Sequence, residues 1–154
     1  MTLENLLNIG QLKPHDAGAA EIQRLLGAAR RNLADARATG ISQETRFDAA
    51  YKAIMQSALA ALMANGFRPD TNKPGHHVTV IQSLPKTIGL KGERVAVLDA
   101  LRHKRNLSDY AGDDIDHASV ETCIKEAGNL LKEVDAWVRK IRPDLAPPAE
   151  DVKK

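Results

Sequence analysis

The side chains that could most readily bind a ligand or catalyse a reaction lie on a predicted helix over residues 93–109. At 100° per residue, its apolar residues form one core-facing stripe: Val95, Leu98 and Leu101. The same stripe continues with charged residues: Arg102, Arg105 and Asp109. Unpaired charges on a buried face cost several kcal/mol. These side chains must therefore be paired, or must face a cleft or a partner surface.

Two interpretations of the charged stripe are open. In the first, Arg102 or Arg105 pairs with Asp109 and locks the end of the helix. In the second, the arginines line a cleft that handles phosphate, because a guanidinium makes bidentate contacts with oxyanions.

Two adjacent histidines, His76 and His77, are further candidates for ligand binding in the same cleft. They begin a segment that follows Pro74, and a purely structural role is the alternative for both. Because neighbouring side chains on a helix diverge by about 100°, the pair cannot easily share one metal ion. We predict no metal site and no cofactor. The single cysteine, Cys123, is predicted to be a small core residue rather than a nucleophile.

Amphipathic periodicity predicts five helices that would position these residues. They span about residues 17–38, 43–64, 74–88, 93–109 and 118–141. The stretch His77–Ile81 is β-branched enough to form a strand, but a lone strand would leave its backbone groups without partners. A helix that bends or ends near Pro85 is therefore favoured.

Composition supports an all-α, up-and-down bundle of about five helices. The chain has 154 residues, of which 3% are aromatic and 23 are alanine. Barrels and sandwiches depend on aromatic and β-branched residues, whereas alanine suits closely packed helices. We expect an N-terminal arm (1–16), a single helical domain (17–142) and a flexible, proline-rich charged tail (143–154).

The sequence and its composition also limit which partners and which cellular location we expect. No segment has 18 uncharged apolar residues, and the N-terminus lacks the pattern of a signal peptide, so we expect a cytoplasmic protein without membrane contact. The net charge of +2 argues against a general nucleic-acid coat. With so few aromatics, contact with RNA would use arginine and phosphate, with little sequence preference.

The stretch Leu101–Tyr110, LRHKRNLSDY, resembles the signature helix of HEPN domains, the small all-helical domains of prokaryotic toxin–antitoxin and defence systems. Residues 46–54, 65–69 and 75–81 also resemble family segments, so the likeness covers roughly residues 17–141. It implies a bundle of four or five helices, often a two-fold dimer with a composite cleft. In active members the RNA's own 2′-hydroxyl attacks, a His handles the proton, and an Arg neutralises phosphate charge without metal.

Arg105 and Asn106 match the Arg–polar pair of that family, but the family His is missing: Ser108, Asp109 and Tyr110 stand there. An unperturbed Asp is a weak base, and an unperturbed Tyr seldom supplies one at neutral pH. Catalysis would need perturbed groups or another histidine. Tyr110 could instead be modified by a partner nucleotidyltransferase, as in some relatives, or pack as a tip residue against another helix.

Two functions remain open. The first is a HEPN-like module, a homodimer whose Arg102 and Arg105 cleft binds RNA, a nucleotide or a protein. It would act in a toxin–antitoxin or stress system, with a nucleotidyltransferase antitoxin as partner. The alternative is an active, metal-independent endoribonuclease toxin that uses Arg105 with Asp109, Tyr110 or a histidine from elsewhere.

Overall fold

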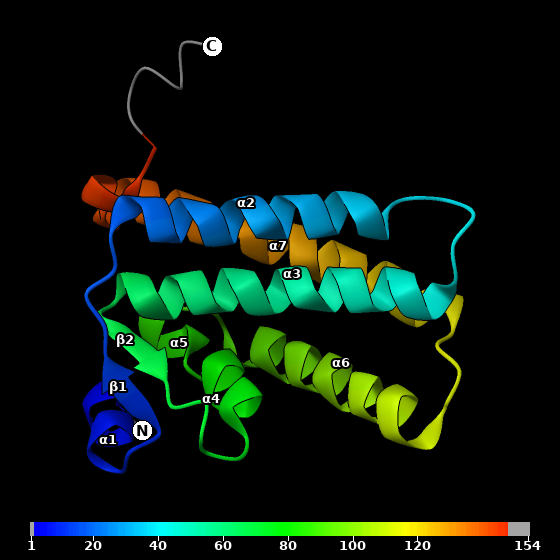
Figure 1. Cartoon of the computed structure of the whole chain (residues 1–154), viewed down its shortest axis with the longest axis horizontal. Helices are drawn as coiled ribbons and strands as arrows, with labels where there is room; N and C mark the ends of the chain where they lie inside the picture. Colours follow the sequence, from blue (N-terminus) through cyan, green and yellow to red (C-terminus); the bar gives the residue numbers. More distant parts are fainter. Residues whose placement is uncertain (1, 148–154) are drawn as a thin grey trace.

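A computed structural model describes residues 2–147 as an all-α helical bundle with one very small sheet (Figure 1). The helices are α1 (Leu3–Asn8), α2 (Ala19–Ala36), α3 (Gln43–Ala64), α4 (His76–Gln82), α5 (Leu84–Thr87), α6 (Gly92–Ala111) and α7 (His117–Ile141). The strands are β1 (Leu12–Pro14) and β2 (Phe67–Pro69), and a 3-10 turn, η1, spans Pro143–Leu145. The predicted fold class is confirmed.

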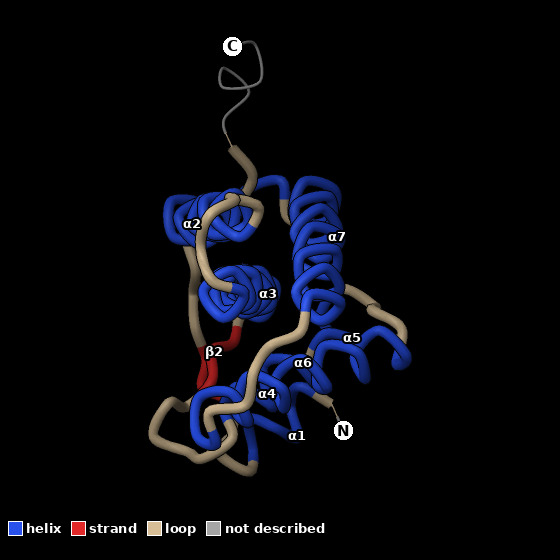
Figure 2. The backbone as a smooth tube through the Cα atoms, turned by 90° about the vertical axis from the view of Figure 1, so that its right-hand side faces the viewer, coloured by secondary structure: helices blue, strands red, loops and turns tan. Residues whose placement is uncertain are grey.

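Helix α3 is the centre of the bundle. Helices α2 and α7 lie along it on one side, and α4, α5 and α6 lie on the other (Figure 2). Because neighbours cover several of its faces, 11 of its 22 residues are buried: Phe47, Ala50, Tyr51, Ala53, Ile54, Ser57, Ala58, Ala60, Ala61, Leu62 and Ala64. A helix buried on several faces has little amphipathic contrast, and small alanines let its neighbours approach closely.

Local signals in the sequence set where these helices begin and end. The Ser42 hydroxyl accepts a hydrogen bond from the backbone N–H of Thr45 at 3.1 Å and so caps the start of α3. The Asp116 carboxylate caps α7 in the same way: it accepts a hydrogen bond from the backbone N–H of Ser119, also at 3.1 Å. Gly112 ends α6 with a φ of 71°, in the left-handed region that glycine adopts without strain.

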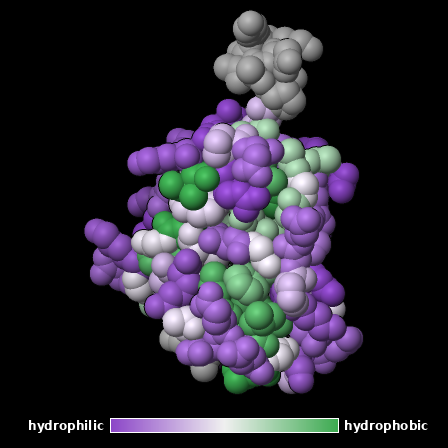
Figure 3. Space-filling view, turned by 90° about the vertical axis from the view of Figure 1, so that its left-hand side faces the viewer, coloured by the Kyte–Doolittle hydropathy of each residue, from purple (hydrophilic) through white to green (hydrophobic). Residues whose placement is uncertain are grey.

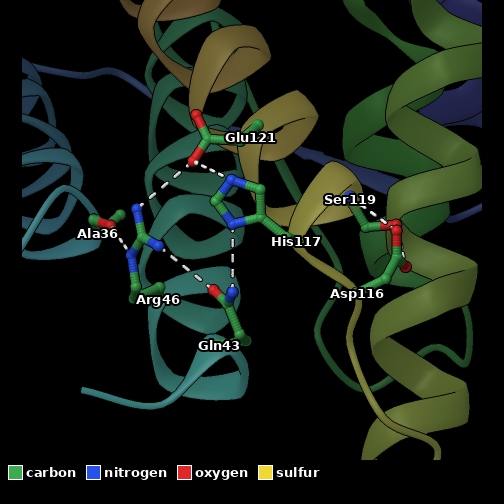
Figure 4. A network of polar contacts seen from close by, with 7 residues as sticks. All are labelled: Ala36, Gln43, Arg46, Asp116, His117, Ser119 and Glu121. Atoms are coloured by element: carbon green, nitrogen blue, oxygen red, sulfur yellow. Dashed lines mark hydrogen bonds and ion pairs between the residues drawn. The ribbon is translucent and has the colours of Figure 1, made fainter. Parts of the chain in front are cut away.

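A polar network joins the start of α3 to its two long neighbours (Figure 4). Arg46 donates from Nε to the carbonyl of Ala36 at the end of α2, at 2.8 Å, and lies 3.6 Å from Glu121 of α7. Gln43 and Glu121 both contact His117, at 3.2 and 3.6 Å. These contacts fix the ends of α2, α3 and α7 relative to one another.

The ambiguous segment around His77–Ile81 is helical, as favoured from the sequence. It forms α4, and the chain then turns at Ser83 into α5, which contains Pro85. The break near Pro85 is therefore confirmed.

The N-terminal arm contributes more structure than expected. Strand β1 pairs antiparallel with β2, with Leu12 opposite Pro69, and Leu12 is only 1% exposed. The sheet was not predicted because two strands of three residues are too short to show an alternating pattern. Figure 3 shows the end of the molecule where α1 and the sheet lie, with an apolar area on its lower half within a largely hydrophilic surface.

The expected flexible tail from Pro143 needs correction at its start. Residues 143–145 form η1, where Leu145 is 3% exposed and its carbonyl accepts a hydrogen bond from Gln23 of α2 at 3.0 Å. Arg142 donates to the carbonyl of Ala64 at 2.7 Å. An apolar side chain and two hydrogen bonds thus hold this segment to the bundle, while residues 148–154 lie outside the described part.

None of the helices described between residues 2 and 147 combines the length and the apolar character needed to span a membrane.

Candidate functional site

Helix α6, which carries most of the predicted site, is attached to the bundle by few side chains. Only Leu98 and Leu101 of its 20 residues are buried, and Val95 is partly buried against the core. The predicted apolar stripe is therefore correct. Arg102 does not pair with Asp109: its Nε donates to Asp99 Oδ1 at 2.9 Å, one turn earlier on the helix.

Arg105 makes two contacts from the same stripe. Its Nε lies 3.5 Å from Asp109 Oδ2, so this Arg–Asp pair forms as one of the two sequence interpretations expected. Its guanidinium carbon also lies 5.1 Å from the centre of the Tyr51 ring of α3, within the range of a cation–π interaction. The aromatic ring thus holds the arginine at the surface between α3 and α6.

A cavity of about 320 Å³, which we call the polar cavity, opens beside this arginine. Its lining residues come from three helices: Asp48, Tyr51, Lys52 and Met55 of α3, His77 of α4 and Arg105 of α6. The second interpretation, a cleft beside the arginine, therefore also has a structural counterpart. The two interpretations are compatible, because Arg105 both pairs with Asp109 and lines the cavity.

Tyr51 connects the other two walls of the polar cavity. Its hydroxyl lies 3.3 Å from Nδ1 of His77, while its ring carries the Arg105 guanidinium. Burial raises the pKa of Tyr51 to about 12, against the opposing effect of Arg105, so the hydroxyl keeps its proton at neutral pH. Tyr51 therefore acts as a neutral hydrogen-bonding group and not as a base.

Two other groups in the cavity have shifted protonation equilibria. Burial lowers the pKa of His77, and the neighbouring His76, Arg105 and Arg102 lower it further, so the ring is neutral at pH 7. Burial raises the pKa of Asp48, with Asp109 adding to the effect. A neutral histidine that donates its Nδ1–H to the Tyr51 oxygen keeps a lone pair on Nε2 with which it can accept a proton.

The low pKa of His77 gives a testable dependence of stability on pH. Since the folded pKa lies below the ordinary value of 6.5, the unfolded chain binds this proton more tightly. The contribution of His77 to folding is complete above pH 6.5 and is lost as the pH falls through 6.5 towards the folded pKa. Urea titrations of the wild type at a series of pH values should show this loss in the free energy of unfolding. In His77→Gln, the part of the pH dependence that comes from His77 should disappear.

The matched control is His103→Gln, which changes an exposed histidine of α6. If the exposed and the cavity variants had the same pH profile, His77 would not be the group responsible.

The predicted site residues are not all together. Arg105 and His77 line the polar cavity, and His76 lies beside it, its ring centre 4.8 Å from that of His77. Asp109 pairs with Arg105 but does not line this cavity. Tyr110 is 88% exposed, so its expected packing against another helix is wrong. Asn106 is half-buried and lines none of the cavities described for residues 2–147.

The contribution of α3 was missed by sequence reasoning. Tyr51, Asp48, Lys52 and Met55 were not among the predicted site residues. The spacing of the last three at i, i+4 and i+7 places them on one face of the helix, but this spacing alone does not show that the face borders a cavity.

Cys123 is buried, as predicted, and its Sγ lies 3.9 Å from the carbonyl of Phe47. Burial raises the pKa of this thiol to about 12. A thiol with this pKa is not ionised at neutral pH, so it is not a nucleophile.

Comparison with known proteins adds no family: no protein-family model matches this chain, and no curated protein matches it.

Proposed function

We propose that this chain is a HEPN-like module that binds RNA, and that its polar cavity receives an RNA phosphate. The observation that carries the proposal is that Arg105, Lys52 and the neutral His77 line one open cavity. The resemblance of residues 101–110 to the HEPN signature helix supports the same choice of ligand. A homodimer and a nucleotidyltransferase antitoxin as partner, in a toxin–antitoxin or stress system, are further parts of this proposal.

The contacts of Arg105 leave room for a phosphate. Its distance of 3.5 Å from Asp109 is longer than the roughly 2.7–2.9 Å of a strong charge-assisted hydrogen bond. A phosphate can therefore replace Asp109 as the partner of the guanidinium without breaking an optimal pair. Lys52, whose side chain is exposed on the same wall, and the Tyr51 hydroxyl supply further donors.

The test is binding of a labelled stem–loop RNA to the purified protein in EDTA. A charge-assisted hydrogen bond contributes about 1.5–3 kcal/mol, so Arg105→Ala should weaken binding roughly 10-fold or more. Asp109→Asn removes the competing carboxylate and should strengthen binding. The salt dependence of the affinity should become shallower in Arg105→Ala, since one phosphate contact is lost.

Arg31→Ala is the matched control, because Arg31 is exposed on α2 and lies outside the polar cavity. If Arg31→Ala and Arg105→Ala had equal effects, RNA would bind through the general surface of the protein and the proposal would fail. It would also fail if the wild type bound no RNA.

A second candidate function, metal-independent cleavage of the bound RNA, is favoured by the neutral His77 in the cavity. In such a reaction the 2′-hydroxyl attacks its adjacent phosphorus and gives its proton to His77 Nε2. The P–O5′ bond breaks, and the leaving oxygen takes a proton from water. Arg105 would balance the charge that develops on the phosphate.

The same incubation separates the two functions when its products are resolved on a gel. RNA that remains intact in EDTA supports binding alone. Cleavage that disappears in both Arg105→Ala and His77→Gln supports the ribonuclease, and cleavage that survives both variants comes from a contaminant. A general base contributes about 10²–10⁴-fold, so the loss in His77→Gln should be at least 100-fold.

A further inference from the structure

A second cavity lies directly beside the polar cavity, between α3 and α4. It has a volume of about 220 Å³ and shares Lys52, Met55 and His77 with the polar cavity. Its remaining wall is largely apolar and includes Leu59, Pro69 and Val80. We call it the apolar cavity. With about 320 Å³ in the polar part and 220 Å³ in the apolar part, the two adjoining cavities together fall within the usual range of small-molecule sites, roughly 300–1,000 Å³, and we call them the groove.

One face of α3 forms the floor of this groove. Asp48, Lys52, Met55 and Leu59 follow one another at spacings of three or four residues, so they lie in one row along the helix. At about 1.5 Å per residue, Leu59 lies roughly 12 Å along the axis from Tyr51. The groove is therefore charged at the Arg105 end and apolar at the Leu59 end, over a length that accommodates a phosphate, its ribose and one base.

A base cannot use the obvious aromatic surface in the polar cavity, because the Arg105 guanidinium already covers the Tyr51 ring. The apolar cavity offers the alternative. Water within apolar walls finds few hydrogen-bond partners, so a base whose flat faces displace this water gains affinity. The His76 ring adds an aromatic group to the wall, and Gln56 and Thr71 place polar groups where they can meet the edge of a base.

We propose that the apolar cavity is a nucleobase subsite: it holds the base of the nucleotide whose phosphate contacts Arg105. The inference rests on the proposed function and specifies its ligand as a nucleotide unit, recognised by base and phosphate together. The few aromatic residues of the chain led us to expect phosphate contacts only, and this subsite adds a contact with the base that needs no stacked pair of aromatic side chains.

The test compares adenosine 5′-monophosphate with ribose 5-phosphate, two ligands that differ only in the base, by calorimetric titration. The wild type should bind the nucleotide about 10-fold more tightly, at the lower end of what burial of a base against side chains contributes. Leu59→Gln places an amide in the apolar wall. It should reduce this preference to roughly threefold or less and leave the affinity for ribose 5-phosphate within about twofold.

Arg105→Ala provides the opposite pattern, because it acts on the phosphate that both ligands share. It should weaken the binding of both ligands by the same factor and leave the ratio of the two affinities unchanged. Leu25→Gln, the same substitution at a half-buried position of α2 outside the groove, is the matched control and should change neither affinity. Thermal unfolding of each variant shows that it is folded.

Three results would overturn the subsite: no binding of the nucleotide at millimolar concentration, equal affinities of the wild type for the two ligands, or an unchanged ratio in folded Leu59→Gln. Binding of the stem–loop RNA, measured on the same samples, separates this failure from that of the proposed function. Arg105-dependent RNA binding without a base preference leaves the phosphate site in place and removes only the base subsite.

Discussion

Truncation of Phe47 to alanine should lower the free energy of unfolding by about 3–5 kcal/mol, the range for a fully buried phenylalanine. Phe47 is 1% exposed and lies in the central helix α3. The surrounding helices are rich in alanine, whose side chains are too short to move into the vacated space, so the cavity would remain open. Since the total free energy of unfolding of a native protein is only about 5–15 kcal/mol, this loss is severe.

Urea denaturation with wild type and variant side by side measures this effect. Tyr110→Ala is the control: it also removes an aromatic ring, but from a side chain that is 88% exposed. Its effect should stay within about 0.5 kcal/mol. If the two truncations cost the same, Phe47 would not be the anchor of the core that its burial indicates.

Enlargement of Ala60 to leucine should destabilise the protein by about 1–3 kcal/mol, near the upper end of that range. Ala60 is fully buried, and with Ala53, Ser57 and Ala64 it forms a row of small residues along α3. Helix α2 lies along α3, and Asn32 of α2 donates a hydrogen bond to Gln56 of α3 at 2.8 Å. Because the two helices are held this closely, a larger side chain must push them apart.

Thermal unfolding tests the prediction for Ala60, with each kcal/mol expected to lower the Tm by roughly 2–4 °C in a chain of this length. Ala34→Leu makes the same change on the exposed face of α2 and should be nearly neutral. A fully stable Ala60→Leu would mean that α2 and α3 can separate at no cost, contrary to the close packing described.

The long helices could be predicted because each carries a periodic apolar stripe and recognisable caps, such as Ser42 before α3. The sheet of β1 and β2 could not, since three residues show no period and their pairing joins segments more than 50 residues apart. The position of Leu145 was missed for a related reason. A single apolar residue in a proline-rich stretch does not reveal the pocket of the core that it fills.

The candidate site was predictable in part. Arg105 could be found because a charge on an apolar stripe is anomalous within its own helix. Of the two arginines offered as partners of Asp109, Arg105 forms the pair, whereas Arg102 contacts Asp99, which lies one turn earlier on the helix and was not considered. Tyr51 and Lys52 could not be found, since only the packing of α4 and α6 onto α3 shows that this face of α3 borders a cavity.

The uneven burial of α3 and α6 has a consequence for motion. With 11 of 22 residues buried, α3 should exchange its amide hydrogens only on global unfolding, whereas α6, with two of 20 buried, can detach in a local opening. Such an opening would separate Arg105 from His77 and Tyr51 while the α2–α3–α7 core stays intact. A ligand that bridges α3 and α6 binds only the population in which α6 is docked, so it would hold α6 against this opening.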